Sequence, residues 1–270
     1  MSELPPLNHR HHDTVRLHGL LRDAAARREA RAFVLEGPRV VSDALARGVT
    51  LETVYFGQNG RRAFAPLVAR LAAASVPMRD LKEGVLEKIG STKTPQPVLG
   101  VAAIPTPPDL DAVPAGLVVV AVGVADPGNL GTIIRSAEAA GAVAIVTGDG
   151  VDPWNPKVVR GSAGAVLGVP IVTVADVSAA LATLRTRGWR AVGAAAEATE
   201  DYTTAPLSGS VAIVLGSEAH GLPAEVTAVL DASVRIPMTG AIESLNVAVA
   251  ASILMFEAAR QSRSFGDHAS

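Results

Sequence analysis

The sequence contains no cysteine. This absence excludes a disulfide framework, a thiolate nucleophile and a cysteine-based metal site. Aromatic residues make up only 3% of the chain, which argues against an aromatic surface on which nucleic-acid bases stack. The formal net charge of −2 excludes a strongly basic nucleic-acid binder, although it still allows a local basic patch.

Long apolar runs are also absent. The longest, residues 247–259, is interrupted by Ser252 and Glu257 and falls short of the roughly 18 residues of a membrane span. The first residues lack the positive-then-apolar order of a signal peptide. We therefore expect a cytoplasmic protein with no membrane segment.

Several familiar site signatures are missing as well. After a buried strand expected at residues 117–124, the order Asp-Pro-Gly-Asn-Leu-Gly lacks the third glycine of the dinucleotide fingerprint. No phosphate-binding loop, zinc signature or serine-hydrolase elbow occurs. These absences argue against a redox enzyme with a nucleotide cofactor, and we expect no metal.

What the chain does contain is a regular alternation of apolar segments. Its 270 residues, 49% of them hydrophobic, suffice for two domains with sizeable cores. Between residues 33 and 104, short strands alternate with helices, which predicts a small α/β domain. Residues 105–116 contain four prolines and can continue neither a helix nor a central strand. The sequence therefore predicts domains at 1–108 and 117–270 with a linker at 109–116, and residues 1–14 are expected to be flexible.

Residues 1–31 hold six arginines and four of the six histidines. One interpretation is a solvated helix that is ordered by packing along one face. The other is a basic edge that contacts phosphates. The histidines lack carboxylate support for a metal.

The C-terminal half alternates again, and its strands are continuous apolar runs such as residues 211–215. Strands covered on both faces of a parallel sheet have this composition. Ligands of such sheets bind beyond the carboxyl ends of the strands. Three polar turns follow expected strands there, and they comprise residues 126–135 (DPGNLGTIIR), 215–221 (LGSEAHG) and 236–246 (IPMTGAIESLN).

Each of these turns has an ordinary structural explanation. Asn129 could cap a helix, and Arg135 could be a solvated side chain on that helix. Ser244 and Asn246 precede an Ala- and Val-rich helix, where such residues usually satisfy free backbone amides. Helix starts also stabilise developing negative charge, so a functional interpretation stays open beside the structural one.

Together the three segments resemble the motifs of the SpoU (TrmH) branch of the SPOUT superfamily of RNA methyltransferases. Residues 126–141, 214–222 and 236–251 are similar to its first, second and third motifs, respectively. The N-terminal domain resembles, more loosely, the ribosomal-protein-like (L30e-type) substrate domain, through residues 33–41 (FVLEGPRVV).

The resemblance implies an α/β fold with an L30e-like N-terminal domain and a C-terminal parallel-sheet domain. The second domain would carry a trefoil knot, a rare exception to unknotted chains. It also implies a homodimer formed through the C-terminal domain, with S-adenosylmethionine as methyl donor bound in the knot. By motif position, Gly216, Ile236 and Leu245 would hold this cofactor through backbone groups.

Five residues fall at the family's catalytic or substrate-facing positions: Asn129, Arg135, Glu218, Ser244 and Asn246. All five match the family's pattern, whereas Ala219 stands where a glycine is frequent. A small residue is tolerated there if its backbone dihedrals allow it.

The implied reaction moves a methyl group to a ribose 2′-hydroxyl of structured RNA, and we favour 23S ribosomal RNA over transfer RNA. A tRNA 2′-O-methyltransferase and a catalytically silent RNA-binding protein of the same fold are the alternatives. An arginine has been proposed as the base in this family, but a guanidinium stays protonated at neutral pH. We therefore expect Arg135 mainly to position the ribose and its phosphate.

Overall fold

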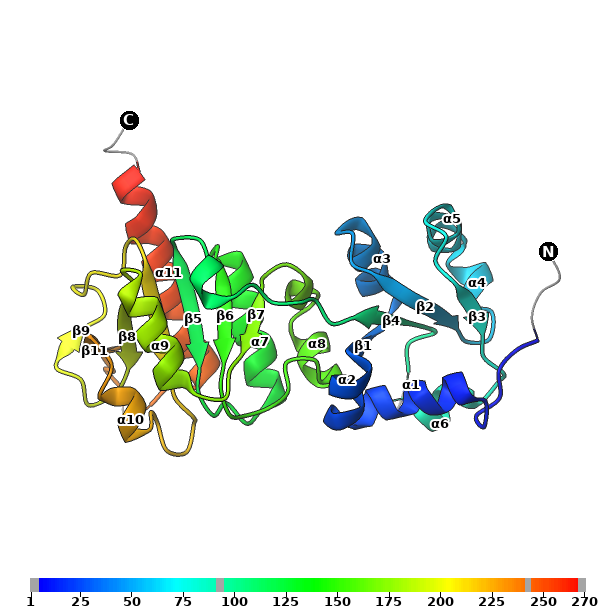
Figure 1. The fold of residues 1–270 in the computed structure, drawn as a ribbon, viewed down its shortest axis with the longest axis horizontal. Helices are drawn as coiled ribbons and strands as arrows, with labels where there is room; N and C mark the ends of the chain where they lie inside the picture. Colours follow the sequence, from blue (N-terminus) through cyan, green and yellow to red (C-terminus); the bar gives the residue numbers. More distant parts are fainter. Residues whose placement is uncertain (1–4, 91–94, 241–243, 267–270) are drawn as a thin grey trace. The chain divides into compact units, whose positions relative to one another are not determined.

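The structure is a computed structural model that describes residues 5–90, 95–240 and 244–266. The chain divides into two compact units (Figure 1). The first comprises Met1–Pro105 together with Trp154–Leu167, and the second comprises Thr106–Pro153 together with Gly168–Ser270. The domain boundaries predicted from the sequence stay a prediction. They differ from these two units mainly because residues 154–167 belong to the first unit.

The first unit is a small sheet with helices around it. Its elements are α1 (His12–Arg22), α2 (Ala24–Ala30), β1 (Ala32–Glu36), α3 (Pro38–Ala46), β2 (Leu51–Phe56), α4 (Gly60–Ala63), α5 (Ala65–Ala73), β3 (Met78–Asp80), α6 (Val85–Ile89), β4 (Val98–Ala103), α8 (Pro156–Gly161) and the 3-10 helix η2 (Ala165–Leu167). The described strands lie in the order β1-β4-β2-β3. Among these described strands, β2 and β3 are parallel, whereas β1–β4 and β4–β2 are antiparallel.

The segment of residues 154–167 packs onto β1 of this unit. The Trp154 ring lies 4.7 Å from the Phe33 ring. The Arg160 guanidinium donates to the carboxylate of Glu36 at 2.7 Å, and the Glu36 side chain is only 2% exposed. The sequence predicts one helix over residues 156–166, but α8 ends at Gly161 because Ala163 adopts a left-handed conformation with φ 51°.

The described residues that precede α1 also pack into this unit. Leu7 is 3% exposed, and its amide donates to the carbonyl of Asp80 at the end of β3. Among the arginines of residues 1–31, Arg16 forms an ion pair with Glu52 at 2.7 Å, and Arg27 is 2% exposed. Residues 5–14, which were expected to be flexible, thus include the buried residue Leu7. Arg16 and Arg27, which were expected to belong to a basic edge, make contacts within the first unit instead.

The second unit contains the large sheet. Its elements are the 3-10 helix η1 (Leu110–Ala112), β5 (Leu117–Ala121), α7 (Pro127–Ala139), β6 (Ala144–Thr147), β7 (Ile171–Thr173), α9 (Val177–Thr186), β8 (Arg190–Ala194), β9 (Glu200–Asp201), β10 (Val211–Leu215), α10 (Ala224–Thr227), β11 (Ala232–Arg235) and α11 (Val247–Gly266). The described strands lie in the order β7-β6-β5-β10-β8-β11-β9. All neighbours are parallel, which confirms the parallel sheet predicted from the sequence. The trefoil knot stays a prediction.

Helices cover both faces of this sheet (Figure 1). Leu181 and Leu184 of α9 pack in one core cluster with Val118 and Val120 of β5. Side chains alternate along a strand, so the intervening residue Val119, also fully buried, faces the other layer. There α7 and α11 contact each other, and α11 also contacts β5 and β10. Among the described residues, no helix is long and apolar enough to cross a membrane.

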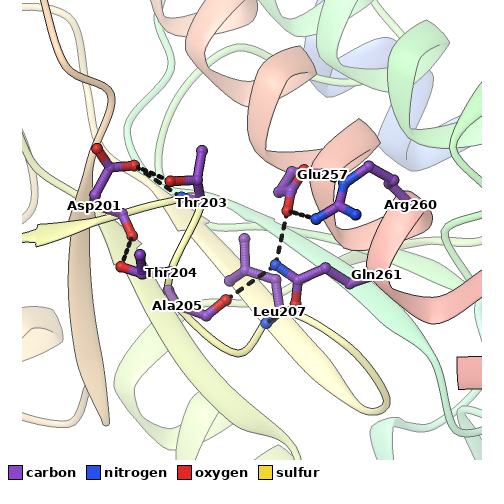
Figure 2. A network of polar contacts seen from close by, with 8 residues as sticks. All are labelled: Asp201, Thr203, Thr204, Ala205, Leu207, Glu257, Arg260 and Gln261. Atoms are coloured by element: carbon purple, nitrogen blue, oxygen red, sulfur yellow. Dashed lines mark hydrogen bonds and ion pairs between the residues drawn. The ribbon is translucent and has the colours of Figure 1, made fainter. Parts of the chain in front are cut away.

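The last turns of α11 are fixed by a polar network (Figure 2). The Gln261 side chain accepts from the amide of Leu207 at 2.8 Å and donates to the carbonyl of Ala205 at 3.1 Å. Glu257 accepts from both Gln261 and Arg260. The hydrogen bonds from Arg260 hold the pKa of Glu257 below its usual range. This network anchors the C-terminal half of the helix whose N-terminal end carries residues of the candidate site.

Candidate active site

The first of the three turns is the start of α7. Pro127 occupies the first helical turn, and the carboxylate of Asp126 caps the helix by accepting from the amide of Asn129 at 2.8 Å. The cap is therefore Asp126, and the interpretation of Asn129 as the cap is wrong. The Asn129 side chain makes its contacts with other segments of the chain instead.

The second turn follows β10 and is a tight hairpin. Ser217 and Gly221 exchange two backbone hydrogen bonds of 3.0 Å, and the amide of His220 donates to the Ser217 hydroxyl at 3.1 Å. A Cβ at Gly216 would overlap the backbone of Gly221, so this position requires glycine. Ala219 is not among the residues with positive φ, which explains why alanine is tolerated where glycine is frequent.

The third turn leads into α11, and its last residue, Asn246, directly precedes the helix. Its side-chain oxygen accepts from the amides of Ala248 at 2.9 Å and Val249 at 3.3 Å, which makes Asn246 the cap of the helix. Its side-chain nitrogen donates to the Asn129 oxygen at 2.9 Å. The structural interpretation of this residue as a cap is therefore confirmed, and its side-chain nitrogen also contacts the first turn, while its functional role stays a prediction.

A chain of hydrogen bonds joins the three turns. Asn246 donates to Asn129, and Asn129 in turn donates to the carboxylate of Glu218 at 2.5 Å. This polar chain (Asn246, Asn129 and Glu218) brings together residues 117 and 89 positions apart. The carboxylate at its end fixes the direction of both amides, since an ionised carboxylate can only accept. The result is a set of oriented dipoles at the carboxyl edge of the sheet, where parallel-sheet proteins bind ligands.

Arg135 and Ser244 lie outside the polar chain in the described contacts. Arg135 follows Asn129 by six residues on α7, which rotates its side chain by about 240° around the helix axis. Its side chain is exposed and forms neither a hydrogen bond nor an ion pair with the residues that the structure describes. Ser244 is exposed two residues before Asn246. A free, exposed guanidinium suits contact with an anion from outside the chain, such as a phosphate.

Two segments of the chain match models of known protein families. Residues 116–256 match the model of the SpoU rRNA Methylase family, and residues 13–100 match the MRM3-like substrate binding domain. The chain belongs to the SpoU rRNA methylase family.

Two curated relatives and one solved structure illustrate the relationship. The 23S rRNA (guanosine-2′-O-)-methyltransferase RlmB of Ralstonia nicotianae is 36% identical over 78% of this chain and 88% of that protein. The 23S rRNA (guanosine(2553)-2′-O)-methyltransferase RlmP of Bacillus subtilis is 31% identical over 85% of this chain and 89% of that protein. The crystal structure of an AdoMet-bound rRNA methyltransferase from Sinorhizobium meliloti superposes with a TM-score of 0.83 at 31% identity, covering 96% of this chain and 97% of that one.

The three positions that the family resemblance assigns to S-adenosylmethionine lie within the second and third turns. Gly216 directly follows β10, Ile236 directly follows β11, and Leu245 precedes α11 by two residues. Within the described ranges, none of their backbone amides takes part in a hydrogen bond. Gly216 is buried, and a buried amide needs a partner. This donor set fits a cofactor with acceptor atoms on its adenine and amino-acid parts.

A polar contact between α7 and α11 was not predicted from the sequence. The hydroxyls of Ser136 on α7 and Ser252 on α11 lie 2.8 Å apart, and Ser252 also donates to the carbonyl of Ala248 at 2.7 Å. The contact fixes the two site-bearing helices against each other. Nothing local in the sequence indicates it, because single serines in apolar helices usually face solvent or their own backbone.

Proposed function

We propose that this protein transfers the methyl group of S-adenosylmethionine to a ribose 2′-hydroxyl of 23S ribosomal RNA. The observation that carries the proposal is the polar chain of Asn246, Asn129 and Glu218, which unites the three motif turns at the carboxyl edge of the sheet. The names of the relatives support the choice of ribosomal RNA. A ribosomal substrate also agrees with the cytoplasmic location that the sequence predicts.

Gly216, Ile236 and Leu245 would bind the cofactor through their backbone groups. When bound, S-adenosylmethionine supplies a methyl group already activated by its sulfonium. The protein therefore needs to hold the ribose hydroxyl in line with that methyl group and to exclude water. No metal enters this proposal.

Different side chains would hold the ribose and the adjacent phosphate. Asn129 and Asn246 form a rigid amide pair, because every end of the pair is held by a hydrogen bond of 2.5–3.3 Å. Together with Glu218 and Ser244 they would orient the ribose. Arg135 would bind the adjacent phosphate, since a guanidinium forms paired hydrogen bonds to phosphate oxygens.

We further propose that the protein works as a homodimer through its second unit. Val249 and Phe256 lie seven residues apart on α11, and they are 47% and 46% exposed, respectively. Residues at this spacing share one face of a helix. A second copy of the chain covering this face would remove both apolar side chains from water.

The test is transfer of a labelled methyl group from S-adenosylmethionine to unmodified 23S ribosomal RNA and to unmodified transfer RNA. We expect label in the ribosomal RNA, lost in Arg135→Ala, and mapping of the nucleotide would define the substrate. Label only in transfer RNA would replace the proposed substrate. Failure to bind S-adenosylmethionine and to label either RNA would leave a silent RNA-binding protein.

The role of Arg135 needs a separate measurement. A pH–rate profile under single-turnover conditions should be the same in the wild type and in Arg135→Lys apart from a lower rate, because we assign this residue to positioning. A titration present in the wild type and absent from the lysine variant would favour a role as base.

A further inference from the structure

We propose that a hollow in the first unit, between the loops that follow β2 and β3, binds an unpaired nucleotide of the substrate RNA. Gln58 and Asn59 would contact the base, and Arg62 and Lys82 would hold the neighbouring phosphates. The inference rests on the proposed function, because it takes RNA as the substrate, but it concerns a different unit of the chain and different residues.

The position of the hollow suits a ligand. It has a volume of about 660 Å³ and is lined by residues 57–62 and 80–83 and by Pro6. This volume lies within the range of about 300–1,000 Å³ typical of small-molecule sites. Phe56 and Asp80 are paired at the ends of the parallel strands β2 and β3, so both loops leave the sheet at the same carboxyl edge.

The first loop is pinned so that two amide side chains point outward. The amide of Gly57 donates to the carbonyl of Pro97, and that of Gly60 to the carbonyl of Gly57, both at 2.9 Å. Both glycines are buried, whereas Gln58 and Asn59 between them are exposed. Asn59 adopts the left-handed conformation with φ 59°, which places it at the tip of the turn.

These two amides are chemically suited to reading a base. Neither Gln58 nor Asn59 uses its side chain in a hydrogen bond within the described part of the chain. Each amide offers two donor hydrogens and one acceptor oxygen, the combination that pairs with base edges. Sequence-specific RNA recognition targets unpaired bases, whose edges are accessible.

The charges around the hollow favour phosphate. Arg61 forms an ion pair with Asp80 at 2.7 Å, and its guanidinium lies 5.5 Å from the centre of the Phe56 ring. The charges of Arg61 and Asp80 therefore cancel each other. Arg62 and Lys82 are exposed and have no ion-pair partner among the residues that the structure describes, and Glu83 is the remaining carboxylate of the lining. Two free cations on the rim match the phosphates that flank one nucleotide.

Two double variants and a matched control separate these roles. Gln58→Ala/Asn59→Gly removes the amides, and glycine accepts the left-handed conformation of position 59. Arg62→Gln/Lys82→Gln removes the charges. Lys88→Gln/Lys157→Gln is the control, because it removes the same charge from exposed positions of the same unit outside the hollow.

The experiment measures the Kd of the full-length variants for unmodified 23S ribosomal RNA at several salt concentrations, and the KM and kcat of methyl transfer. We expect each test variant to raise Kd and KM for RNA about tenfold, with kcat and S-adenosylmethionine binding unchanged. The logarithm of the association constant falls as the logarithm of the salt concentration rises, and the charge variant should make this negative slope about 1.4 smaller in magnitude. The amide variant should leave the slope unchanged.

Test variants that bind RNA as tightly as the control would overturn the inference and leave the proposed function intact. If the wild type binds RNA without methylating it, the proposed function fails, but the Kd comparison still decides the role of the hollow. A wild type that binds S-adenosylmethionine but no RNA overturns both.

Discussion

Asn246 has two structural tasks, and substitution can separate them. Its oxygen caps α11, and its nitrogen donates to Asn129. Loss of a cap costs about 1 kcal/mol, and loss of a partly exposed hydrogen bond costs about 0.5–1 kcal/mol. Asn246→Ala should therefore lower the free energy of unfolding by about 1–2 kcal/mol, which corresponds to a decrease in Tm of about 3–6 °C.

Asn246→Asp should behave differently. Its carboxylate still accepts from the helix amides and is favoured by the helix dipole, so stability should stay within about 0.5 kcal/mol of the wild type. It cannot donate to Asn129, and it places a second negative charge near Glu218 at the end of the polar chain. We expect single-turnover methylation to fall on the order of 100-fold in both variants, because the amide pair loses its fixed orientation.

Thermal unfolding and single-turnover methylation of the two variants give the result. The same substitutions at Asn155, which caps α8 by accepting from the amide of Lys157 at 2.9 Å, provide the control. There alanine should lower stability and aspartate should not, with the methylation rate unchanged in both. Full activity in Asn246→Asp would refute the role of the donated hydrogen bond, and an equal loss of stability in the two Asn246 variants would refute the capping argument.

Three further perturbations test other parts of the structure. Arg160→Met should lower the free energy of unfolding of the first unit by about 2–4 kcal/mol, because it removes the cation from the buried Glu36 carboxylate. Urea unfolding measures this, and a decrease below about 1 kcal/mol would contradict the argument. The pKa of Glu257 is lowered in the folded protein by the hydrogen bonds from Arg260, so this group stabilises the fold above its unfolded pKa, and the contribution disappears as the pH falls through the folded pKa. Glu257→Gln should therefore flatten the decline of Tm in acid, and an unaltered decline would show that the pair contributes nothing. Gly216→Ala should weaken S-adenosylmethionine binding by at least about tenfold in calorimetry, since overpacking distorts the hairpin, and wild-type affinity would show that the turn adapts.

Local composition was sufficient to predict most elements of the second unit. The apolar run at residues 211–215 forms β10, and the run that begins at residue 117 forms β5, as expected for strands buried on both faces. The weak elements were not predicted. The strand β9 has two residues and the helix α10 has four, so neither carries a periodic pattern long enough to detect.

The polar turns illustrate a different limit. Their residue types and their place after strands indicated a site, but not which side chains contact each other. Asn129 and Asn246 both looked like helix caps, and only Asn246 is one, because Asp126 caps α7. The sequence indicated Arg135 and Asn129 equally as site residues. Their spacing along α7 nevertheless puts the Arg135 side chain on a different face of the helix from Asn129.

The arginines of residues 1–31 show why charge in a sequence does not establish a binding surface. Arg27 is 2% exposed and donates to the carbonyl of Leu20 at 2.8 Å, inside the first unit. A guanidinium on a long apolar stem can be buried where carbonyl groups accept its hydrogens. No pattern around Arg27 separates it from its exposed neighbour Arg28.

The sequence by itself determined the α/β class, the parallel sheet and the three turns, because hydrophobic periodicity and turn chemistry act between near neighbours in the chain. Tertiary structure alone decided that residues 154–167 complete the first unit and that Asn246, Asn129 and Glu218 form one polar chain. These contacts join residues about 90 to 120 positions apart, and their energy comes from burial and hydrogen-bond geometry that exist only after the sheet has assembled.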